Sequence, residues 1–478
     1  MADGQRLDRM LRDACASFAA RPAAADREEA LTYAALDALA DETAARLARA
    51  GIAPDEPVLA AVSNRARDLA GLVGIWRAGG VAVPLHRGAV AATAASVRAR
   101  VGARLAVNLR GDLPAPAGLA GADGVLALGG DAPAARPLLA DAAWIVTTSG
   151  STGAPKGVVH AHATYAAKLA MIQSMTGFAP GERVLLVLQL NFSFGQWVAL
   201  LTLLNGGTLV LRDRFEPEAM LADLAAVDRA GVVPTMLRRL RAPLDAGGTD
   251  YAGRLMAGGE VMPAALMRWV LRRWPRARIG DIYGLTETCT CDFFVQPDEA
   301  AAAAGTIGRA GPGIAWRVAP DGELQIASPW RMRGYLDDPA LTEAAYADGH
   351  FRTGDLASLR PDGRVALVGR AKEIIARAGA KVAPLEVEAA FLDHPDVAAA
   401  LAAGVPDPML GEAICLFLVP RGGATLDPAR LRDWARERLD RYKLPDRIML
   451  GEALPVGATG KADRGALRRL AGETGPEC

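Results

Sequence analysis

Residues 147–157, TTSGSTGAPKG, form the stretch whose residue types most clearly suggest chemistry. Glycines let the backbone wrap closely around an anion, and hydroxyl and amide groups donate hydrogen bonds to phosphate oxygens. Lys156 adds a compact positive charge. The spacing departs from the Walker A pattern, in which Gly-Lys-Ser/Thr closes the loop, because Ala154 and Pro155 precede Lys156 in this chain. Taken alone, the stretch favours a phosphate-binding loop and a solvated surface loop about equally.

The loop is the first of a series of short motifs that follow one another along the chain. In order they are TTSGSTGAPKG, AGGEVMP, YGLTET, RTGDL, GRAKEII, KVAPLEVE and LPVGATGKADR. This series resembles the adenylate-forming superfamily, which contains acyl-CoA synthetases, peptide-synthetase adenylation domains and luciferases. The resemblance extends from about residue 31 to residue 470. It implies an enzyme that activates a carboxylic acid with ATP.

The resemblance also implies which phosphates the loop holds. In the family the acid attacks the α-phosphorus of ATP and pyrophosphate leaves, so catalysis is mainly positioning and electrostatic stabilisation. The loop would hold the departing β- and γ-phosphates, which explains why its spacing differs from that of loops serving terminal phosphoryl transfer. The residues expected to bind there are Thr148, Ser149, Gly150, Ser151, Thr152, Gly153 and Lys156.

Two further motifs are expected on the nucleotide. In YGLTET, Tyr283 resembles the aromatic residue that stacks on adenine, Thr286 the hydroxyl at the α-phosphate, and Glu287 the Mg²⁺ ligand. One carboxylate together with phosphate oxygens is a normal ligand set for this ion. In AGGEVMP, Gly259 and Glu260 are expected near the base. Alone, each motif would more often be an ordinary turn.

Three charged residues complete the expected site. Asp355 in RTGDL resembles the carboxylate that accepts both ribose hydroxyls, a task for a side chain that only accepts. Arg370 matches the arginine that also reaches the ribose. Lys461 matches the lysine that bridges the substrate carboxylate and the α-phosphate, with a point charge on a flexible stem. Without the other motifs, each would be an ordinary surface charge.

Because Lys461 lies far along the chain from the ATP loop, the resemblance implies domain movement. Lys372 matches the hinge about which the family rotates its C-terminal domain between two half-reactions. The second orientation would present Gly379 and Lys381 to the site and admit a thiol. Ala378 and Ala380 stand where acyl-CoA synthetases often carry glycine and an aromatic residue, which weakens the inference that the thiol is free CoA.

The segment LQLNFSFGQW is where the family begins its acid pocket. Amino-acid-activating relatives place an aspartate after the phenylalanine, whereas Ser193 follows Phe192 in this chain. An α-amino acid is therefore disfavoured, because a buried ammonium without a carboxylate is costly. The segment resembles the aryl-acid branch, although packing in an ordinary core is an almost equal alternative. The expected pocket residues are Asn191, Phe192, Phe194, Gly195, Trp197 and Gly284.

The rhythm of apolar segments predicts an α/β fold. Helical spacing over residues 31–51 is followed by strand PVLAAVS, helix RDLAGLVGIWRAGG and strand VAVPL, which is typical of parallel sheet. We expect a large N-terminal adenylation domain, residues 1–370, of parallel-rich sheets flanked by helices. Residues 371–478 are expected to form a small, mobile α+β domain that carries the catalytic lysine.

Composition excludes several other classes of protein. The 478 residues hold 54 basic and 54 acidic side chains, so nothing favours nucleic acid or an anionic membrane surface. No apolar run reaches the ~18 residues of a membrane helix, and the first residues lack the apolar core of a signal peptide. The five cysteines are scattered, with Cys289 and Cys291 forming a lone Cys-x-Cys pair. A cytoplasmic protein with reduced thiols is expected.

The sequence thus predicts an acid–thiol ligase that uses ATP and Mg²⁺, forms acyl-AMP from an aryl or compact apolar acid, and most simply passes the acyl group to CoA. The alternative acceptor is the phosphopantetheine thiol of an acyl or aryl carrier protein. An oxidative, luciferase-like use of the adenylate is a weaker alternative. A non-catalytic acyl-AMP binder is disfavoured because Thr286, Glu287, Asp355, Arg370 and Lys461 are all present.

Overall fold

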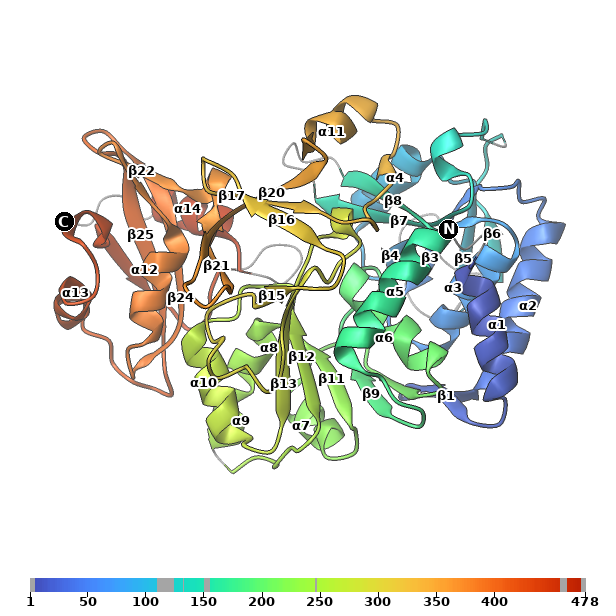
Figure 1. The fold of residues 1–478 in the computed structure, drawn as a ribbon, viewed down its shortest axis with the longest axis horizontal. Coiled ribbons are helices and arrows are strands. Elements are labelled where there is room, and N and C mark those ends of the chain that lie inside the picture. Colours follow the sequence, from blue (N-terminus) through green and yellow to red (C-terminus); the bar gives the residue numbers. More distant parts are fainter. Residues whose placement is uncertain are drawn as a thin grey trace.

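The computed structural model describes residues 5–109, 124–131, 133–149, 155–245, 247–455 and 462–473. These residues form four sheets with helices packed on them (Figure 1). Three sheets belong to a large N-terminal domain, and the fourth belongs to a smaller C-terminal domain. The α/β class predicted from the alternation of apolar segments is confirmed.

The largest sheet has the order β15-β14-β13-β12-β11-β9-β10-β1-β2. Its strands from β13 to β1 pair in parallel, while β14, β15 and β2 add antiparallel edges. Side chains of α7 to α10 share one apolar cluster with this sheet. The strands are β1 (Pro22–Ala25), β2 (Ala30–Thr32), β9 (Arg183–Leu186), β10 (Thr208–Leu211), β11 (Arg229–Val232), β12 (Arg254–Gly258), β13 (Arg278–Tyr283), β14 (Phe293–Val295) and β15 (Arg309–Ala310). The helices are α7 (Pro217–Leu224), α8 (Pro234–Arg239), α9 (Arg241–Asp245) and α10 (Ala264–Arg273).

The second sheet has the order β18-β8-β7-β4-β3-β5-β6. Its centre is parallel, whereas β7 and β8 form an antiparallel hairpin in which Thr148 lies opposite Lys156. Of the predicted phosphate-binding stretch, the first residues therefore belong to β7 and the last to β8, while residues 150–154 lie outside the described residues. Strand β8 follows the loop, and its residues GVVHA pair with β7. The strands are β3 (Pro57–Val62), β4 (Val81–His86), β5 (Leu105–Asn108), β6 (Gly124–Ala127), β7 (Ala142–Ser149), β8 (Pro155–Ala161) and β18 (Gly334–Tyr335).

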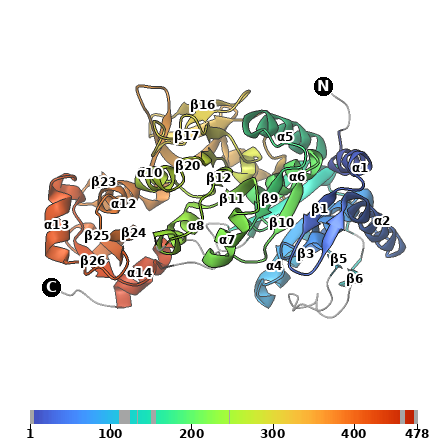
Figure 2. The same cartoon turned by 90° about the horizontal axis from the view of Figure 1, so that it is seen from below.

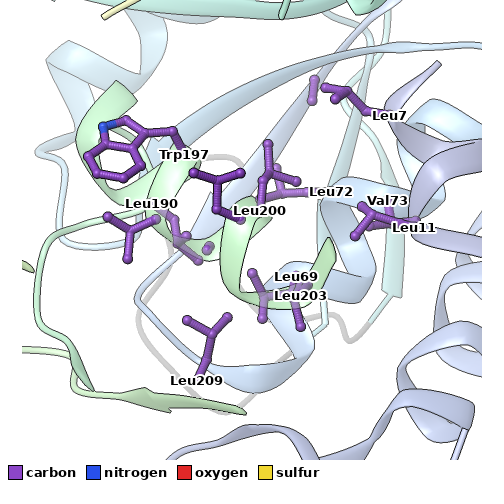
Figure 3. Packing of buried hydrophobic residues seen from close by; sticks show 14 of the residues in the cluster. Leu7, Leu11, Leu69, Leu72, Val73, Leu190, Trp197, Leu200, Leu203 and Leu209 are labelled. Atoms are coloured by element: carbon purple, nitrogen blue, oxygen red, sulfur yellow. The ribbon is translucent and has the colours of Figure 1, made fainter. Parts of the chain in front are cut away.

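A layer of helices joins these two sheets through the main apolar core. Figure 3 shows leucines of α1 and α3 packing toward Leu200 and Leu203 of α6, next to Leu209 of the first sheet. Trp197 is 1% exposed within this core. Because α6 is held by the core along its length, its first turn is fixed where the acid pocket was predicted. The helices are α1 (Leu7–Ser17), α2 (Tyr33–Arg49), α3 (Ala66–Arg77), α5 (His162–Thr176) and α6 (Ser193–Leu204), and α4 (Ala91–Val101) packs on the second sheet through a separate cluster.

The third sheet is antiparallel, with the order β16-β17-β20-β19 and β21 paired with β20. Its pairing places Asp355 directly opposite Arg370. The strands are β16 (Ala315–Val318), β17 (Glu323–Ala327), β19 (Tyr346–Ala347), β20 (His350–Leu359) and β21 (Val365–Arg370), with α11 (Pro339–Ala344) nearby and η1 (Pro137–Leu139) against β8. Short sequence patterns do not predict this sheet, because its strands pair across long distances along the chain.

The C-terminal domain is built on the sheet β23-β22-β25-β24, with β26 parallel to β25. It lies against the side of the large domain that carries α8 and α10 (Figure 2). The short helix η3 (Ala371–Glu373) connects it to β21. Its elements are β22 (Ile375–Arg377), β23 (Ala380–Val382), α12 (Pro384–Leu392), β24 (Val397–Asp407), β25 (Gly411–Pro420), α13 (Pro428–Arg436), η4 (Arg441–Lys443), β26 (Arg447–Leu450) and α14 (Arg464–Glu473).

Among the residues that the structure describes, every helix is too short or too polar to cross a lipid bilayer.

Candidate active site

Three strands bring residues predicted to bind the nucleotide together at one corner of the large domain. The Tyr283 hydroxyl donates a hydrogen bond to Asp355 Oδ2 at 2.7 Å, and Arg370 Nε donates to Asp355 Oδ1 at 2.9 Å. The β20–β21 pairing and the end of β13 place these groups. Each carboxylate oxygen keeps a second lone pair, so Asp355 can still accept hydroxyl donors. Burial, and then the neighbouring Asp355, raise the pKa of Tyr283 well above its ordinary value, so its phenol stays protonated.

A tyrosine connects Lys156 to Glu287. The Tyr335 hydroxyl donates to Glu287 Oε1 at 2.9 Å, and Lys156 Nζ lies 5.2 Å from the centre of the Tyr335 ring. The backbone N–H of Met332 donates to the Glu287 carbonyl at 2.8 Å, which fixes the short helix η2 (Thr286–Thr288). The structure thus brings Lys156 and Glu287 together. Tyr335, which joins them, was missed from the sequence because no motif surrounds it.

Glu287 offers a single carboxylate to a cation. Within the part of the chain that the structure describes, no group of three or more His, Cys, Asp or Glu side chains could hold a metal ion. A Mg²⁺ ion at Glu287 would therefore take its remaining oxygen ligands from phosphates and water, as is usual for nucleotide-bound Mg²⁺. The donor set fits that ion, and its chemistry would be to neutralise charge on the phosphate oxygens.

The turn after Tyr283 connects the nucleotide side to the acid side. Ser193 Oγ lies 3.5 Å from Thr286 Oγ1, so the first turn of α6 reaches the predicted α-phosphate contact. A Cβ atom on Gly284 would lie 2.2 Å from the backbone nitrogen of Cys291. Only glycine lets the chain double back at this position, which explains this residue in the YGLTET motif.

The residues predicted for the acid pocket lie at the start of α6. The Phe194 ring stacks on Trp197, with ring centroids 5.3 Å apart. Asn191 Oδ1 is buried and has no hydrogen-bond partner, so it can accept a donor from a ligand. A Cβ atom on Gly195 would lie 2.4 Å from the carbonyl oxygen of Gln189, so glycine permits this close approach. Phe192 differs from its neighbours because it is 44% exposed.

Glu260 is held by α8 rather than left free. It accepts hydrogen bonds from Thr235 N at 3.1 Å and Oγ1, and its carboxylate pairs with Arg238 at 3.1 Å. Gly259, with φ +77°, makes the turn that directs Glu260 to these partners. Glu260 therefore shapes the end of β12 through α8, beside the Tyr283 corner.

A fully buried ion pair supports the turn that carries Thr286 and Glu287. Lys168 Nζ of α5 donates to Asp292 Oδ1 at 2.8 Å and lies 5.2 Å from the centre of the Trp330 ring. The Thr288 hydroxyl donates to the other oxygen of Asp292. Burial raises the pKa of Asp292, and Lys168 opposes that effect. Sequence analysis missed this pair because a lone lysine on a helix ordinarily predicts a solvated side chain.

The stretch between η2 and Asp292 is strained. Its three residues have positive φ angles of 63°, 60° and 48°, in a region that side chains other than glycine rarely adopt. They are Cys289, Thr290 and Cys291. Both cysteines are buried, and burial raises the pKa of the Cys291 thiol to about 12. The two cysteines therefore pack in the core. The strained turn is held in place by the neighbouring Lys168–Asp292 ion pair.

Several predicted residues lie outside the described part of the chain. They are Gly150, Ser151, Thr152, Gly153 and Lys461. Thr148 and Ser149 end β7 at the base of the loop. Three residues after Lys461, Arg464 pairs with Glu388 at 2.8 Å and with Glu373 at 3.4 Å, so the segment that follows the predicted catalytic lysine is anchored beside the predicted hinge.

The predicted hinge and thiol-side residues lie after the Tyr283 corner along the chain. Lys372 is an exposed residue of η3, directly after β21. Gly379 and Lys381 lie on the exposed β22–β23 hairpin of the C-terminal domain. Ala378 in this hairpin has φ +49°, so its turn uses a conformation better suited to glycine. Lys372 follows Arg370 of the Tyr283 cluster by two residues, whereas Gly379 and Lys381 belong to the sheet of the C-terminal domain.

Comparisons with known proteins agree with this architecture. Residues 11–336 match the model of the AMP-binding enzyme family, and residues 386–461 match the model of its C-terminal domain. A feruloyl-CoA synthase of Amycolatopsis sp is 32% identical over 476 residues, which cover 93% of this chain and 94% of the relative. A 2-succinylbenzoate–CoA ligase of Bacillus licheniformis is 32% identical over 337 residues, covering 68% of this chain and 70% of the relative. The solved amide bond synthetase of Marinactinospora thermotolerans superposes with a TM-score of 0.83 at 25% identity, covering 97% of this chain and 99% of that one.

The fold and the polar cluster define an adenylate-forming enzyme. The chain belongs to the AMP-binding enzyme family, and it is an enzyme of the acid–thiol ligase class.

Proposed function

We propose that this enzyme converts a compact aryl carboxylic acid to its CoA thioester through an acyl-AMP intermediate. The observation that carries the proposal is the convergence of Tyr283, Asp355 and Arg370 with the Lys156–Tyr335–Glu287 group on one side of the large domain. The match of nearly the full chain to a feruloyl-CoA synthase also supports it.

In the proposed first half-reaction, a carboxylate oxygen of the acid attacks the α-phosphorus of ATP, and the bond to the β-phosphate breaks. Asp355 holds the ribose hydroxyls, and Thr286 donates to an α-phosphate oxygen. Lys156 remains beside the departing pyrophosphate, and Glu287 would hold Mg²⁺, which neutralises charge on the phosphates. In the second half-reaction, a thiolate attacks the acyl carbon, the carbon–oxygen bond to phosphate breaks, and AMP leaves.

The aryl preference is proposed from the start of α6. Phe194 is half-buried and stacks on the buried Trp197, so an aryl ring of the acid would pack against Phe194, with Trp197 supporting it from the core. The unpartnered Oδ1 of Asn191 can accept a hydrogen bond from a ring hydroxyl, because a buried acceptor without a partner is costly. No carboxylate follows Phe192, which disfavours α-amino acids.

A panel of acids tests the proposal. The purified enzyme, ATP and Mg²⁺ are incubated with benzoates, hydroxybenzoates, ferulate, indoleacetate, short aliphatic acids and amino acids, with and without CoA, and pyrophosphate and acyl-CoA are measured. Aryl acids should give both products. Pyrophosphate release with amino acids alone would contradict the acid class. If the acyl group were transferred only to a phosphopantetheinylated carrier protein, that protein and not CoA would be the acceptor. If it were transferred to an amine, the acceptor would not be a thiol.

Lys461 is proposed to act only in the first half-reaction. Replacing Lys461 with alanine should lower acyl-AMP formation at least about 100-fold, because a charge that bridges carboxylate and α-phosphate is lost. Thioester formation from supplied acyl-AMP should persist, since the lysine is not needed for attack by the thiol. Equal loss of both half-reactions would show that this assignment is wrong.

Residues 1–370 and 371–478 are proposed as the two bodies that move about Lys372 between these steps.

A further inference from the structure

A cleft of about 220 Å³ lies where the C-terminal domain meets α9 and α10 of the large domain. Its charged and titratable lining residues are Arg241, Arg268, Arg272, Asp393, His394 and Arg421. One ion pair crosses the cleft, from Arg268 to Asp393 at 3.3 Å. We refer to this feature as the arginine cleft.

The positive charges of the arginine cleft exceed its negative charge. Within the described residues, no ion pair involves Arg241, Arg272 or Arg421. Arg421 donates instead to the carbonyl of Val397, and Arg241 lies over the Trp269 ring. The lining therefore has four guanidinium groups against one carboxylate.

Two of these guanidinium groups, those of Arg241 and Arg421, are partly removed from water, whereas Arg268 and Arg272 are exposed. The Nε atoms of Arg241 and Arg421 are buried and have no hydrogen-bond partner. Burial, followed by the nearness of Arg421, lowers the pKa of Arg241 to about 10. An arrangement that desolvates like charges and leaves donors unused is costly unless an anion completes it.

Another arginine at the same domain boundary, Arg238, has negatively charged partners. Arg238 is half-buried near both domains, but Glu260 lies 3.1 Å away and Glu388 of the C-terminal domain supplies a second negative charge. The boundary thus contains one arginine with two negative charges near it and, at α9 and α10, four arginines whose nearby negative charges are Asp393, paired with Arg268, and Asp245, close to Arg241.

We propose that the arginine cleft binds a phosphate group of a small molecule. The guanidinium group is the side chain best shaped for phosphate oxygens, and four of them line the cleft with a single carboxylate. The cleft has the volume of about seven water molecules at ~30 Å³ each, which is room for an inorganic pyrophosphate group. Two sources share this chemistry: free pyrophosphate, and the phosphates of CoA in the proposed reaction.

Because its lining comes from both sides of η3, an occupied cleft also favours the domain arrangement seen in the structure. An anion between Arg241 and Arg421 replaces their repulsion with two attractions, one to each domain. Ligand binding to one arrangement stabilises it by the difference in affinity between the two arrangements.

Calorimetric titration with inorganic pyrophosphate tests the site. Lys156→Ala removes the lysine of the candidate ATP site and serves as the background, which is compared with the double variants Lys156→Ala/Arg421→Gln and Lys156→Ala/Arg430→Gln. Arg430 is a matched control because it is an arginine of the same domain whose side chain is 88% exposed. The Arg421 variant should bind at least about tenfold more weakly, and the Arg430 variant should bind as the background does.

A second titration, with CoA and with dephospho-CoA, identifies the source. Weakening of pyrophosphate binding alone assigns the site to the free anion, and weakening of CoA but not dephospho-CoA binding assigns it to the 3′-phosphate. Arg421→Gln that changes neither titration overturns the proposal. Acyl-AMP formation by Arg421→Gln is measured in parallel, so that failure of the cleft and failure of the proposed function are distinguishable. Hydrogen exchange across Ala371–Glu373 should slow when the cleft is filled, and an unchanged rate would contradict the coupling to domain arrangement.

Discussion

Two ion pairs near the candidate active site differ in how much water reaches them. In the pair of Asp355 and Arg370, the arginine side chain is 54% exposed and the aspartate side chain 6%, so water reaches the pair from the arginine side. In the pair of Lys168 and Asp292, the side chains are 1% and 0% exposed. The first pair can exchange a partner for a substrate hydroxyl, whereas the second can only hold the protein together. Exposure thus distinguishes the pair that is predicted to bind the nucleotide from the pair that supports the fold.

The largest effect should come from breaking the buried pair. Lys168→Met leaves the Asp292 carboxylate buried without its cation, which should destabilise the fold by about 3–5 kcal/mol. Lys168→Met/Asp292→Leu removes both charges and should cost clearly less than the sum of the single changes. Urea unfolding of the single and double variants measures this. Additive costs would show that the two groups are not coupled.

Breaking the open pair should affect binding and leave the fold intact. Asp355→Asn keeps the shape of the side chain but loses a charged acceptor, so kcat/KM for ATP should fall about 10–100-fold with little change in stability. Asp348→Asn is a matched control on the same sheet, with a side chain that is 83% exposed. If both variants behaved alike in ATP kinetics, Asp355 would have no special role.

A third carboxylate sharpens the comparison because it is buried without a cation. Asp281 of β13 has an unpartnered Oδ1, and burial raises its pKa from 3.8 to about 7. Between pH 4 and 7 the folded state therefore binds more protons than the unfolded state, so this group lowers stability as pH rises through that window. Asp281→Asn should reduce the loss of stability between pH 5 and 8, by an amount of the order of 1–3 kcal/mol. Urea unfolding of both proteins at pH 5 and pH 8 measures this difference. If the variant lost as much stability as the original protein, a group other than Asp281 would be responsible for the pH dependence.

The smallest effect is expected at a pair with no burial on either side. The side chains of Arg436 and Asp433 on α13 are 63% and 70% exposed. Arg436→Ala should change the free energy of unfolding by no more than about 0.5 kcal/mol, because water screens the pair. Urea unfolding measures this change as well. A cost comparable with that of Lys168→Met would show that burial does not determine how much an ion pair matters to this fold.

Sequence reasoning reached the motif residues because their chemistry follows from residue type and order. Tyr283, Asp355 and Arg370 are such residues, and the structure does bring them together. Residue type and order could not predict Tyr335, because its contact with Glu287 depends on the antiparallel pairing of β18 with β8. It also missed the Lys168–Asp292 pair, since spacing along α5 does not reveal what lies opposite a lysine.

The same limit applies to the fold. Local alternation of apolar residues predicted the βαβ units and the C-terminal α+β domain, because each depends on neighbours in the sequence. The third sheet and the pairing of β7 with β8 depend on contacts between strands, which short patterns do not specify. The division at residue 370 and the movement about Lys372 stay predictions.

The central claim is that an acid attacks the α-phosphorus of ATP at the Tyr283 corner. The most direct measurement uses an accepted acid labelled with ¹⁸O in both carboxylate oxygens, together with ATP and CoA, followed by mass spectrometry of the products. The account predicts one ¹⁸O atom in the phosphate of AMP and none in pyrophosphate. Formation of ADP with the label in inorganic phosphate, or AMP without label, would contradict it.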